Sequence, residues 1–172
     1  MPQATARPAL FLDRDGVLNE DRGYVHRWAD FAWVAGAREA VAAFNRAGWW
    51  VFVVTNQSGV GRGYYGEADV AALHAAMAED LARAGGHFDA VYYSPHHPQA
   101  SVAAYRHPDP PHRKPNPGML RQAMAEFPVD AARSLMVGDK PADLEAARRA
   151  GVRGLLFPGG DLMAFLRPEL PS

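Results

Sequence analysis

Short apolar segments alternate with longer segments of mixed polarity along most of the chain. Five apolar runs rich in β-forming residues predict strands at residues 9–12, 49–54, 88–93, 134–137 and 154–157. Helices are predicted between and after them, from apolar spacing or flanking Pro and Gly, at residues 37–47, 67–84, 117–127, 142–150 and 161–166. Such alternation is typical of a parallel sheet with helices on both faces. We therefore expect an α/β, Rossmann-like fold in a single domain that spans residues 1–172.

Three polar segments interrupt this pattern, and we expect each of them to be irregular. Residues 55–63 are rich in Gly and follow the second strand, whereas residues 19–33 and 94–117 are too long for simple turns. The last segment is rich in Pro and His, which excludes a long regular element. Long loops in compact domains are often functional, so these segments are candidates for the walls of a binding site.

Two acids, Asp13 and Asp15, directly follow the first predicted strand, and Gly16 ends it. Residues two apart in an extended chain point to the same side, so the two carboxylates repel unless a cation or a shared proton holds them. A hard cation such as Mg²⁺ suits oxygen ligands, although a simple polar turn has the same composition. Thr55 and Asp139 lie at the ends of two later strands. Because ligands bind outside the carboxyl ends of parallel strands, this convergence predicts one active site.

Composition narrows the class of protein. The chain has 172 residues, of which 48% are hydrophobic, and a formal net charge of -1, so bulk charge suggests neither nucleic acid nor an anionic membrane as a partner. It contains no cysteine, which excludes disulfides and thiolate metal sites. No signal-peptide core follows Met1, and no segment approaches the roughly 20 apolar residues of a membrane span. We expect a cytoplasmic monomer.

Six side chains form the candidate catalytic set: Asp13, Asp15, Thr55, Lys114, Asp139 and Asp143. Carboxylates on a cation, one hydroxyl and one lysine are the groups that phosphoryl transfer requires. The cation neutralises phosphate charge so that a carboxylate can approach, and the lysine stabilises the equatorial oxygens. A carboxylate nucleophile forms an aspartyl-phosphate and divides one difficult step into two easier ones.

The same residues fall into motifs that resemble a known family. Segments 13–17, 54–56, 113–115 and 138–143 resemble, in order, the four motifs of the haloacid dehalogenase (HAD) superfamily of phosphatases. Segments 19–25, 55–63, 94–98 and 113–119 are similar to one branch of it, which contains the heptose bisphosphate and histidinol phosphate phosphatases. The resemblance implies a HAD-like fold without a large cap and Mg²⁺-dependent hydrolysis of a phosphorylated sugar. The expected substrate is D-glycero-D-manno-heptose 1,7-bisphosphate, with histidinol phosphate, a broader substrate range or a catalytically silent binding protein as alternatives.

The resemblance also implies a role for each catalytic residue. Asp13 is the nucleophile and a metal ligand, and Asp139 completes the metal shell. Asp15 protonates the leaving oxygen, activates the hydrolytic water and offers its backbone carbonyl to the metal. Thr55 holds the transferring phosphoryl group, and Lys114 pairs with the nucleophile, unless it is a solvated lysine. Asp143 orients the metal site from behind the ligands or, alternatively, is a helix N-terminal acid favoured by the helix dipole.

A second set of residues is expected to bind the substrate: Asn19, Asp21, Tyr24, Asn56, Ser58, Arg62, Arg113 and Lys140. Arg62 and Arg113 are candidates for a clamp on a second, non-reacting phosphate, because guanidinium binds phosphate in a bidentate manner. Arg62 is alternatively a plain surface charge.

One departure from the pattern concerns zinc. Close relatives in that branch carry a zinc site of three Cys and one His in the proline-rich segment. This chain has Ser94 at the first Cys position, whereas His96 matches the ligand His. A site of His96, Asp109 and His112 is compatible with zinc chemistry, but we expect a metal-free loop held by its prolines, with His97 and His107 exposed. Mg²⁺ is therefore the expected cofactor, without zinc.

Overall fold

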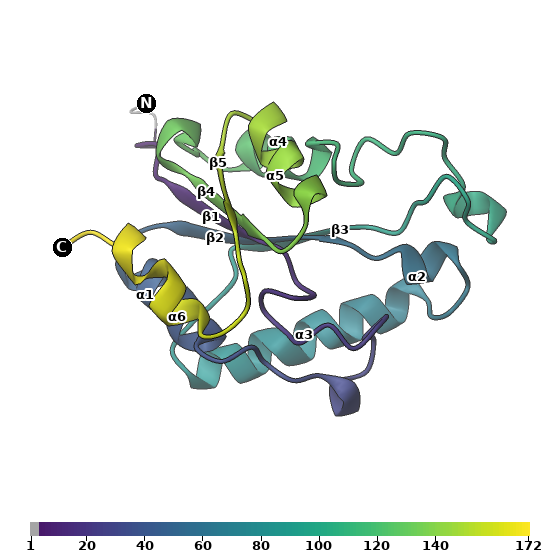
Figure 1. The fold of residues 1–172 in the computed structure, drawn as a ribbon, viewed down its shortest axis with the longest axis horizontal. Coiled ribbons are helices and arrows are strands. Elements are labelled where there is room, and N and C mark those ends of the chain that lie inside the picture. Colours follow the sequence, from purple (N-terminus) through teal and green to yellow (C-terminus); the bar gives the residue numbers. More distant parts are fainter. Residues whose placement is uncertain (1–3) are drawn as a thin grey trace.

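Five parallel strands form one central sheet in the computed structural model, which describes residues 4–172. The order across the sheet is β3-β2-β1-β4-β5, and every neighbouring pair is parallel. The strands are β1 (Ala9–Leu12), β2 (Trp50–Asn56), β3 (Ala90–Ser94), β4 (Leu135–Gly138) and β5 (Arg153–Leu156) (Figure 1). The sheet expected from the sequence is confirmed.

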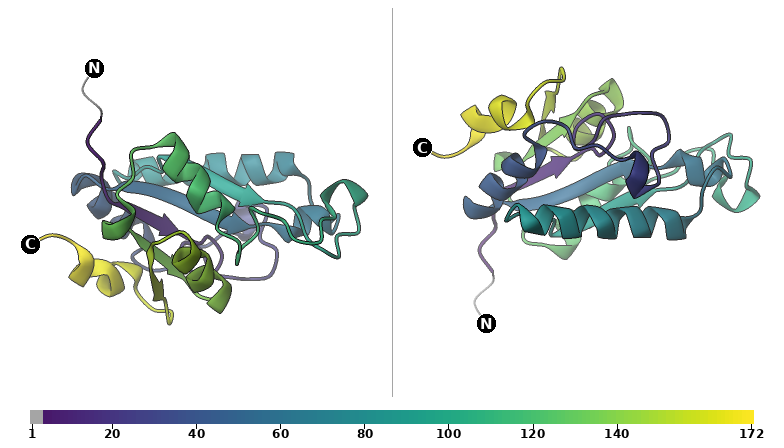
Figure 2. Two further views of the ribbon diagram at one scale, coloured as in Figure 1. Left: turned by 90° about the horizontal axis from the view of Figure 1, so that it is seen from above. Right: turned by 90° about the horizontal axis from the view of Figure 1, so that it is seen from below.

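Helices cover both faces of this sheet (Figures 1 and 2). One face carries α1 (Ala37–Arg46), α3 (Glu67–Arg83) and α6 (Leu162–Leu166), and the other carries α4 (Gly118–Glu126) and α5 (Pro141–Arg149). A single turn, α2 (Ser58–Gly61), follows β2, and short 3₁₀ turns occur at Trp28–Asp30, Ala103–Tyr105, Ala131–Arg133 and Arg167–Glu169. None of the helices within residues 4–172 has the length and hydrophobicity that crossing a membrane requires.

The two faces have separate cores, because successive side chains of a strand point to opposite sides of the sheet. In β1, Leu10 and Leu12 enter the core beneath α1 and α3, whereas Phe11 enters the core beneath α4 and α5. All four residues of β1 are buried. The strand is therefore apolar throughout, and it ends directly before Asp13, the first polar residue.

Most element boundaries lie one or two residues away from the sequence expectation, and three of the differences concern the segments around the site. Strand β2 continues through Thr55 and Asn56, which pair with β3, instead of ending at Val54. The Gly-rich segment after it forms α2 instead of an open loop, and α4 begins at Gly118 with Pro117 as its capping residue. The pattern of apolar residues did not reveal these ends, because the polar residues involved belong to regular structure.

The proline-rich segment is attached to α3 by one carboxylate. Glu67 accepts hydrogen bonds from the hydroxyl groups of Tyr93 (2.7 Å) and Tyr105 (2.8 Å), and these bonds lower the pKa of Glu67. The backbone N–H of Val102 donates to the carbonyl of Gly61 at 2.9 Å. A Cβ on Gly61 would lie 2.7 Å from the carbonyl oxygen of Pro95, so only glycine permits this close approach.

Candidate active site

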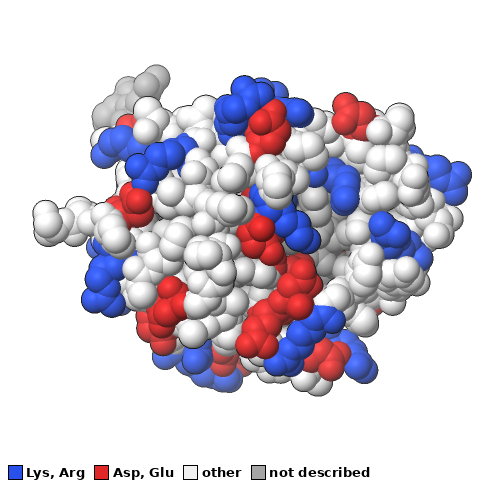
Figure 3. Space-filling view, in the orientation of Figure 1, with Lys and Arg blue, Asp and Glu red and all other residues white. Residues whose placement is uncertain are grey.

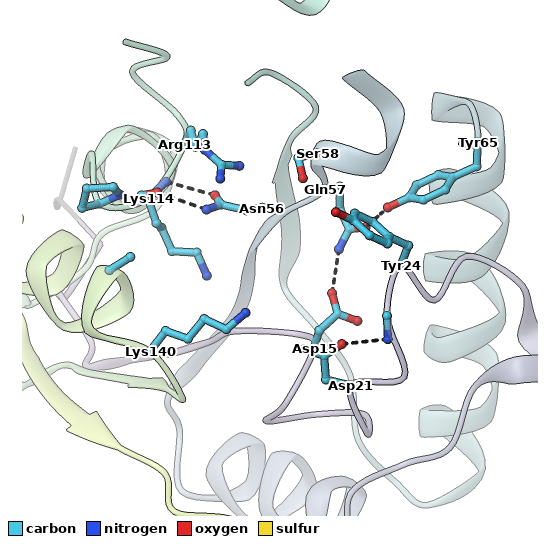
Figure 4. A pocket seen from close by; sticks show the side chains of 13 residues that line it. Asp15, Asp21, Tyr24, Asn56, Gln57, Ser58, Tyr65, Arg113, Lys114 and Lys140 are labelled. Carbon is cyan, nitrogen blue, oxygen red and sulfur yellow. Dashed lines mark hydrogen bonds between the residues drawn. The ribbon is translucent and has the colours of Figure 1, made fainter. Parts of the chain in front are cut away.

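The polar residues at the carboxyl ends of β1, β2 and β4 surround one cavity of about 550 Å³. Figure 3 shows acidic side chains grouped near the middle of this face of the molecule, with basic side chains around a hollow beside them. In Figure 4, Lys114 and Arg113 lie on one side of the cavity, opposite Asp15, Gln57 and Tyr24. The lining consists of Asp15, Asp21, Gly23, Tyr24, Asn56, Gln57, Ser58, Tyr65, Arg113, Lys114, Pro115, Lys140 and Ala142.

Lys114 is the buried cation of the site. Its Nζ lies 2.8 Å from Oδ1 of Asp13 and 2.6 Å from Oδ1 of Asp143, and it also donates to the carbonyl of Val54 at 2.9 Å. All three charged residues are at most 8% exposed. Burial raises the pKa of Asp13, and the positive charge of Lys114 opposes that rise. The two carboxylates in turn raise the pKa of Lys114, so this lysine stays charged despite its burial.

Three carboxylates fit a divalent cation. Ligand oxygens of Asp13, Asp139 and Asp143 lie within 4.8 Å of one another, the one such acidic or histidine group within residues 4–172. Oδ1 of Asp139 is buried and has no hydrogen-bond partner, which is the state expected of an oxygen that binds a cation. Its carboxylate also occupies the space beside Gly16, where a Cβ would lie 2.1 Å from Oδ2. The donor set is all oxygen, as Mg²⁺ prefers.

Asp143 is committed to other partners than a cation. Its Oδ2 accepts the backbone N–H groups of Asp139 and Lys140, both at 3.1 Å, and its Oδ1 binds Lys114. The residue therefore caps α5 and at the same time fixes Lys114 and the backbone of Asp139. Asp143 therefore has features of both roles considered for it: it is an acid in the first turn of a helix, and it orients groups of the site from behind the ligands. Asp13 and Asp139 remain as the side chains best placed to hold the metal.

Asp15 is held by donors on several sides. The guanidinium of Arg14 donates to it at 3.0 Å, the side-chain amide of Asn19 at 3.1 Å and that of Gln57 at 3.0 Å. Arg14 is itself fully buried and also donates to the carbonyl of Val25 at 2.6 Å, so it ties the acid to the segment that follows β1. The carboxylate of Asp15 is therefore fixed at the border of the cavity.

Thr55 and Asn56 end β2 beside this acid. Oγ1 of Thr55 accepts a hydrogen bond from Gln57 at 2.9 Å, and its own hydrogen is donated over a long 3.4 Å to the carbonyl of Asn56, a weak bond that a phosphoryl oxygen can replace. Asn56 and the backbone of Lys114 bond reciprocally, with Nδ2 donating to the carbonyl at 3.1 Å and the lysine N–H donating to Oδ1 at 3.0 Å. This pair sets the position from which Lys114 reaches Asp13. The Lys114–Pro115 peptide bond is cis.

Most of the residues expected to bind substrate line the cavity: Asp21, Tyr24, Asn56, Ser58, Arg113 and Lys140. Two do not. Asn19 is fully buried and bonds to Asp15 and to the carbonyl of Glu20, so it supports the acid from behind. Burial and, after it, the charge of Arg62 lower the pKa of Arg113. Nε of Arg62 and Nη1 of Arg113 are both buried without a hydrogen-bond partner.

The site and fold can now be compared with known proteins. A model of HAD-hydrolase-like proteins matches residues 111–164. The chain is 44% identical over 167 residues to the D-glycero-beta-D-manno-heptose-1,7-bisphosphate 7-phosphatase of Rhodopseudomonas palustris, a match that covers 97% of this chain and 92% of that protein. It is also 44% identical over 144 residues to the D-glycero-alpha-D-manno-heptose-1,7-bisphosphate 7-phosphatase of Burkholderia mallei, covering 84% and 76% of the two chains. The chain belongs to this family of HAD phosphatases.

A solved structure supports the same conclusion. D,D-heptose 1,7-bisphosphate phosphatase from B. bronchiseptica, complexed with magnesium and phosphate, is 36% identical to this chain with a TM-score of 0.78. The match covers 96% of this chain and 89% of that one. The expectations of a HAD-like fold without a cap and of a phosphatase are therefore confirmed.

Four residues of this HAD phosphatase site were missed in the sequence: Arg14, Gln57, Tyr65 and His74. Arg14 donates through Nη1 toward Nε2 of His74 at 3.3 Å, and burial followed by the charge of Arg14 lowers the pKa of His74 to about 3. The imidazole is thus neutral and accepts the bond. Arg14 and Gln57 stand inside the motifs at residues 13–17 and 55–63, which were the available signals. Tyr65 and His74 lie on other elements, and nothing in their spacing indicates contact with the acids.

The three residues of the zinc alternative, His96, Asp109 and His112, do not form a cluster of metal ligands in the part of the chain that the structure describes. Asp109 accepts a bond from Asn116 at 2.7 Å, and Nε2 of His112 lies 3.2 Å from Oε1 of Gln122. His96 packs against Tyr105. The three candidate zinc ligands therefore contact other residues, and the chain contains no cysteine that could serve as a ligand in their place.

Proposed function

We propose that this protein hydrolyses the 7-phosphate of D-glycero-D-manno-heptose 1,7-bisphosphate with Mg²⁺ as cofactor. The observation that carries the proposal is that one cavity is lined at one side by Lys114, beside the buried Asp13, and also by Arg113, which has an unpartnered guanidinium nitrogen. A reacting phosphate and a second anion fit the two regions. The relatives that act on heptose bisphosphates, and the one bound to magnesium and phosphate, support this choice of substrate and metal.

The nucleophile is the free oxygen of Asp13. Oδ1 accepts bonds from Lys114 and from the backbone N–H of Arg14, so Oδ2 is the oxygen available to attack phosphorus. Lys114 and the hydroxyl of Thr55 stabilise the charge of the transferring phosphoryl group. A bound Mg²⁺ supplies charge neutralisation that lets the carboxylate approach the phosphate.

Asp15 acts first as the general acid and then as the general base. It gives a proton to the sugar oxygen as the phosphorus–oxygen bond of the ester breaks, which leaves the phosphoryl group on Asp13. It then takes a proton from the water that attacks this aspartyl-phosphate, which releases inorganic phosphate and regenerates the Asp13 carboxylate and the protonated form of Asp15. The position of Asp15 at the cavity border supports this role, because a substrate oxygen can reach it there.

Arg113 and Arg62 are proposed to bind the remaining phosphate. The charge of Arg62 acts unfavourably on Arg113, burial strengthens this repulsion, and each guanidinium has a buried nitrogen without a partner. An anion between them removes this cost and provides the missing hydrogen-bond acceptors. A bisphosphate brings such an anion, whereas histidinol phosphate brings a cationic amine that both arginines disfavour.

The test is a side-by-side comparison of both heptose 1,7-bisphosphate anomers, the corresponding 7-monophosphate and histidinol phosphate, with ³¹P NMR to identify the phosphate released. Arg113→Ala is expected to lower kcat/KM for the bisphosphate about ten- to a hundredfold through the lost charge-assisted contact and to leave the monophosphate unchanged. The exposed Arg133→Ala is the matched control.

A preference for histidinol phosphate, or an equal loss on bisphosphate and monophosphate, would refute the bisphosphate assignment. Absence of turnover by the wild type with any ester in the presence of Mg²⁺ would instead favour the silent binding protein. We further propose a single-domain, cytoplasmic monomer, for which light scattering of the purified chain tests the oligomeric state.

A further inference from the structure

Gln57 is the polar residue whose hydrogen bonds connect the two sides of the catalytic chemistry. Its Nε2 donates to Oδ2 of Asp15 at 3.0 Å and to Oγ1 of Thr55 at 2.9 Å, and its Oε1 accepts from the hydroxyl of Tyr65 at 2.7 Å. The residue is only 2% exposed, yet it borders the cavity. Figure 4 shows its amide between Asp15 and Tyr65.

Tyr65 decides which way this amide points. The two ends of a glutamine amide have nearly the same shape, so the hydrogen-bond partners determine its orientation. The partners of Nε2 are a carboxylate and a hydroxyl, and both accept. The hydroxyl of Tyr65 must therefore donate to Oε1, and it can do so throughout the neutral range because burial raises the pKa of Tyr65 to about 12.

The ring of Tyr65 is itself held in place. It stacks on His26 with a centroid distance of 4.6 Å and an interplanar angle of 10°. The ring also packs directly against the backbone of Gly59 in α2, because a Cβ on that glycine would lie 2.2 Å from Cε1 of Tyr65. The tyrosine is 8% exposed. These contacts fix the hydroxyl that orients Gln57.

We propose that Gln57 is a positioning residue for acid catalysis: its amide, oriented by Tyr65, holds the carboxylate of Asp15 in the place from which it reaches the leaving oxygen. The inference rests on the proposed phosphatase function. Arg14 and Asn19 bind the same carboxylate, but they are fully buried behind it. Gln57 alone of the three lines the cavity, so it fixes the acid on the side that faces the substrate.

The readout is the dependence of rate on the leaving group. An alkyl ester such as a sugar phosphate needs a proton on its leaving oxygen, whereas p-nitrophenyl phosphate releases a stable phenolate and needs little acid catalysis. Gln57→Leu, which keeps similar volume but has no donor, is expected to lower kcat for the alkyl ester about ten- to a hundredfold more than for the aryl ester, which is part of the roughly 10²–10⁴-fold that general acid catalysis contributes. Tyr65→Phe should show the same selectivity at about three- to tenfold.

Two controls separate positioning from other effects. Thr55→Val removes a hydroxyl that acts on the transferring phosphoryl group, so it should lower kcat for both esters by the same factor. Tyr92→Phe removes a hydroxyl of equal burial, also 2.7 Å from its acceptor, but in the core on the other face of the sheet, and should change neither rate. Circular dichroism and urea unfolding establish that each variant is folded.

The inference is overturned if Gln57→Leu and Tyr65→Phe both lower kcat by the same factor for the two esters, as is expected of Thr55→Val. It is also overturned if neither variant changes kcat. Hydrolysis of both esters by the wild type is measured first, so failure of the proposed function is seen there and not in the variants.

Discussion

Replacing Lys114 by Met tests the electrostatic account of the site through stability alone. The lysine is the cation shared by Asp13 and Asp143, at 2.8 and 2.6 Å, and its side chain is 3% exposed. Methionine is close to lysine in length and fills the same space without a charge. The variant therefore isolates the loss of the ion pairs from the loss of packing.

The expected cost follows from what the substitution leaves behind. Two buried carboxylates remain near Asp139 with no cation, and removing one partner of a buried pair typically costs about 3–5 kcal/mol. Because the charge of Lys114 lowers the pKa of Asp13, its removal raises that pKa further. The cost is therefore fully present at high pH, where the carboxyl group is ionised, and decreases as the pH falls and the group takes up a proton.

Urea unfolding at pH 8 and pH 5, in buffer without divalent cations, measures both effects. Adding Asp143→Asn to Lys114→Met should recover part of the stability at pH 8, since one of the two stranded charges is removed. Lys140→Met is the control, because this lysine is exposed and should change stability by less than about 0.5 kcal/mol. A loss below about 1 kcal/mol at pH 8, or an equal loss at both pH values, would contradict the reasoning.

Further predictions concern the nucleophile, the cofactor and a buried histidine. Asp13→Asn should fold but lose phosphatase activity by several orders of magnitude, and near-normal turnover would exclude Asp13 as nucleophile. Activity should require Mg²⁺ and be inhibited by Ca²⁺, whose longer and more numerous bonds allow a carboxylate to bind through both oxygens; full activity in excess chelator would contradict this. Elemental analysis should find little or no zinc, and one zinc per chain that is lost in His96→Ala would overturn that expectation. The lowered pKa of His74 predicts stability that is present above pH 6.5 and falls by about 2 kcal/mol at pH 5, so His74→Gln, which keeps an acceptor for Arg14, should show a smaller loss between pH 7 and pH 5 in urea unfolding.

The sheet and the grouping of acids at its edge could be predicted because they follow from local pattern. Residues that end buried strands leave the core at the same edge, so Asp13, Thr55 and Asp139 meet without any knowledge of the loops. The same argument does not reach Lys114, which lies in an irregular segment. Its position was assigned from resemblance, and its contacts with Asp13 and Asp143 are what the structure adds.

The supports of the acid could not be derived from spacing. Asn19 was expected to touch substrate, but it bonds to Asp15 from behind, because the chain after β1 folds back on itself. Gln57 and Tyr65 meet through a turn whose glycines allow close packing, and that geometry depends on contacts between side chains rather than on period. Which side of a catalytic carboxylate a neighbour occupies is set by tertiary packing, and a pattern of hydrophobic residues contains no information about it.

The attachment of the proline-rich segment has a consequence for how this enzyme can change. The acids and Thr55 lie at or directly after strand ends fixed by the sheet, whereas Arg113 and Lys114 come from a segment whose regular structure is one 3₁₀ turn and which is fastened to α3 through Glu67 and Tyr105. Substitutions between Tyr105 and Arg113 therefore alter the wall that carries Arg113 and leave Asp13, Thr55 and Asp139 where they are. One phosphorylated substrate can therefore be exchanged for another through changes in this segment, provided that the backbone of Lys114 stays bonded to Asn56.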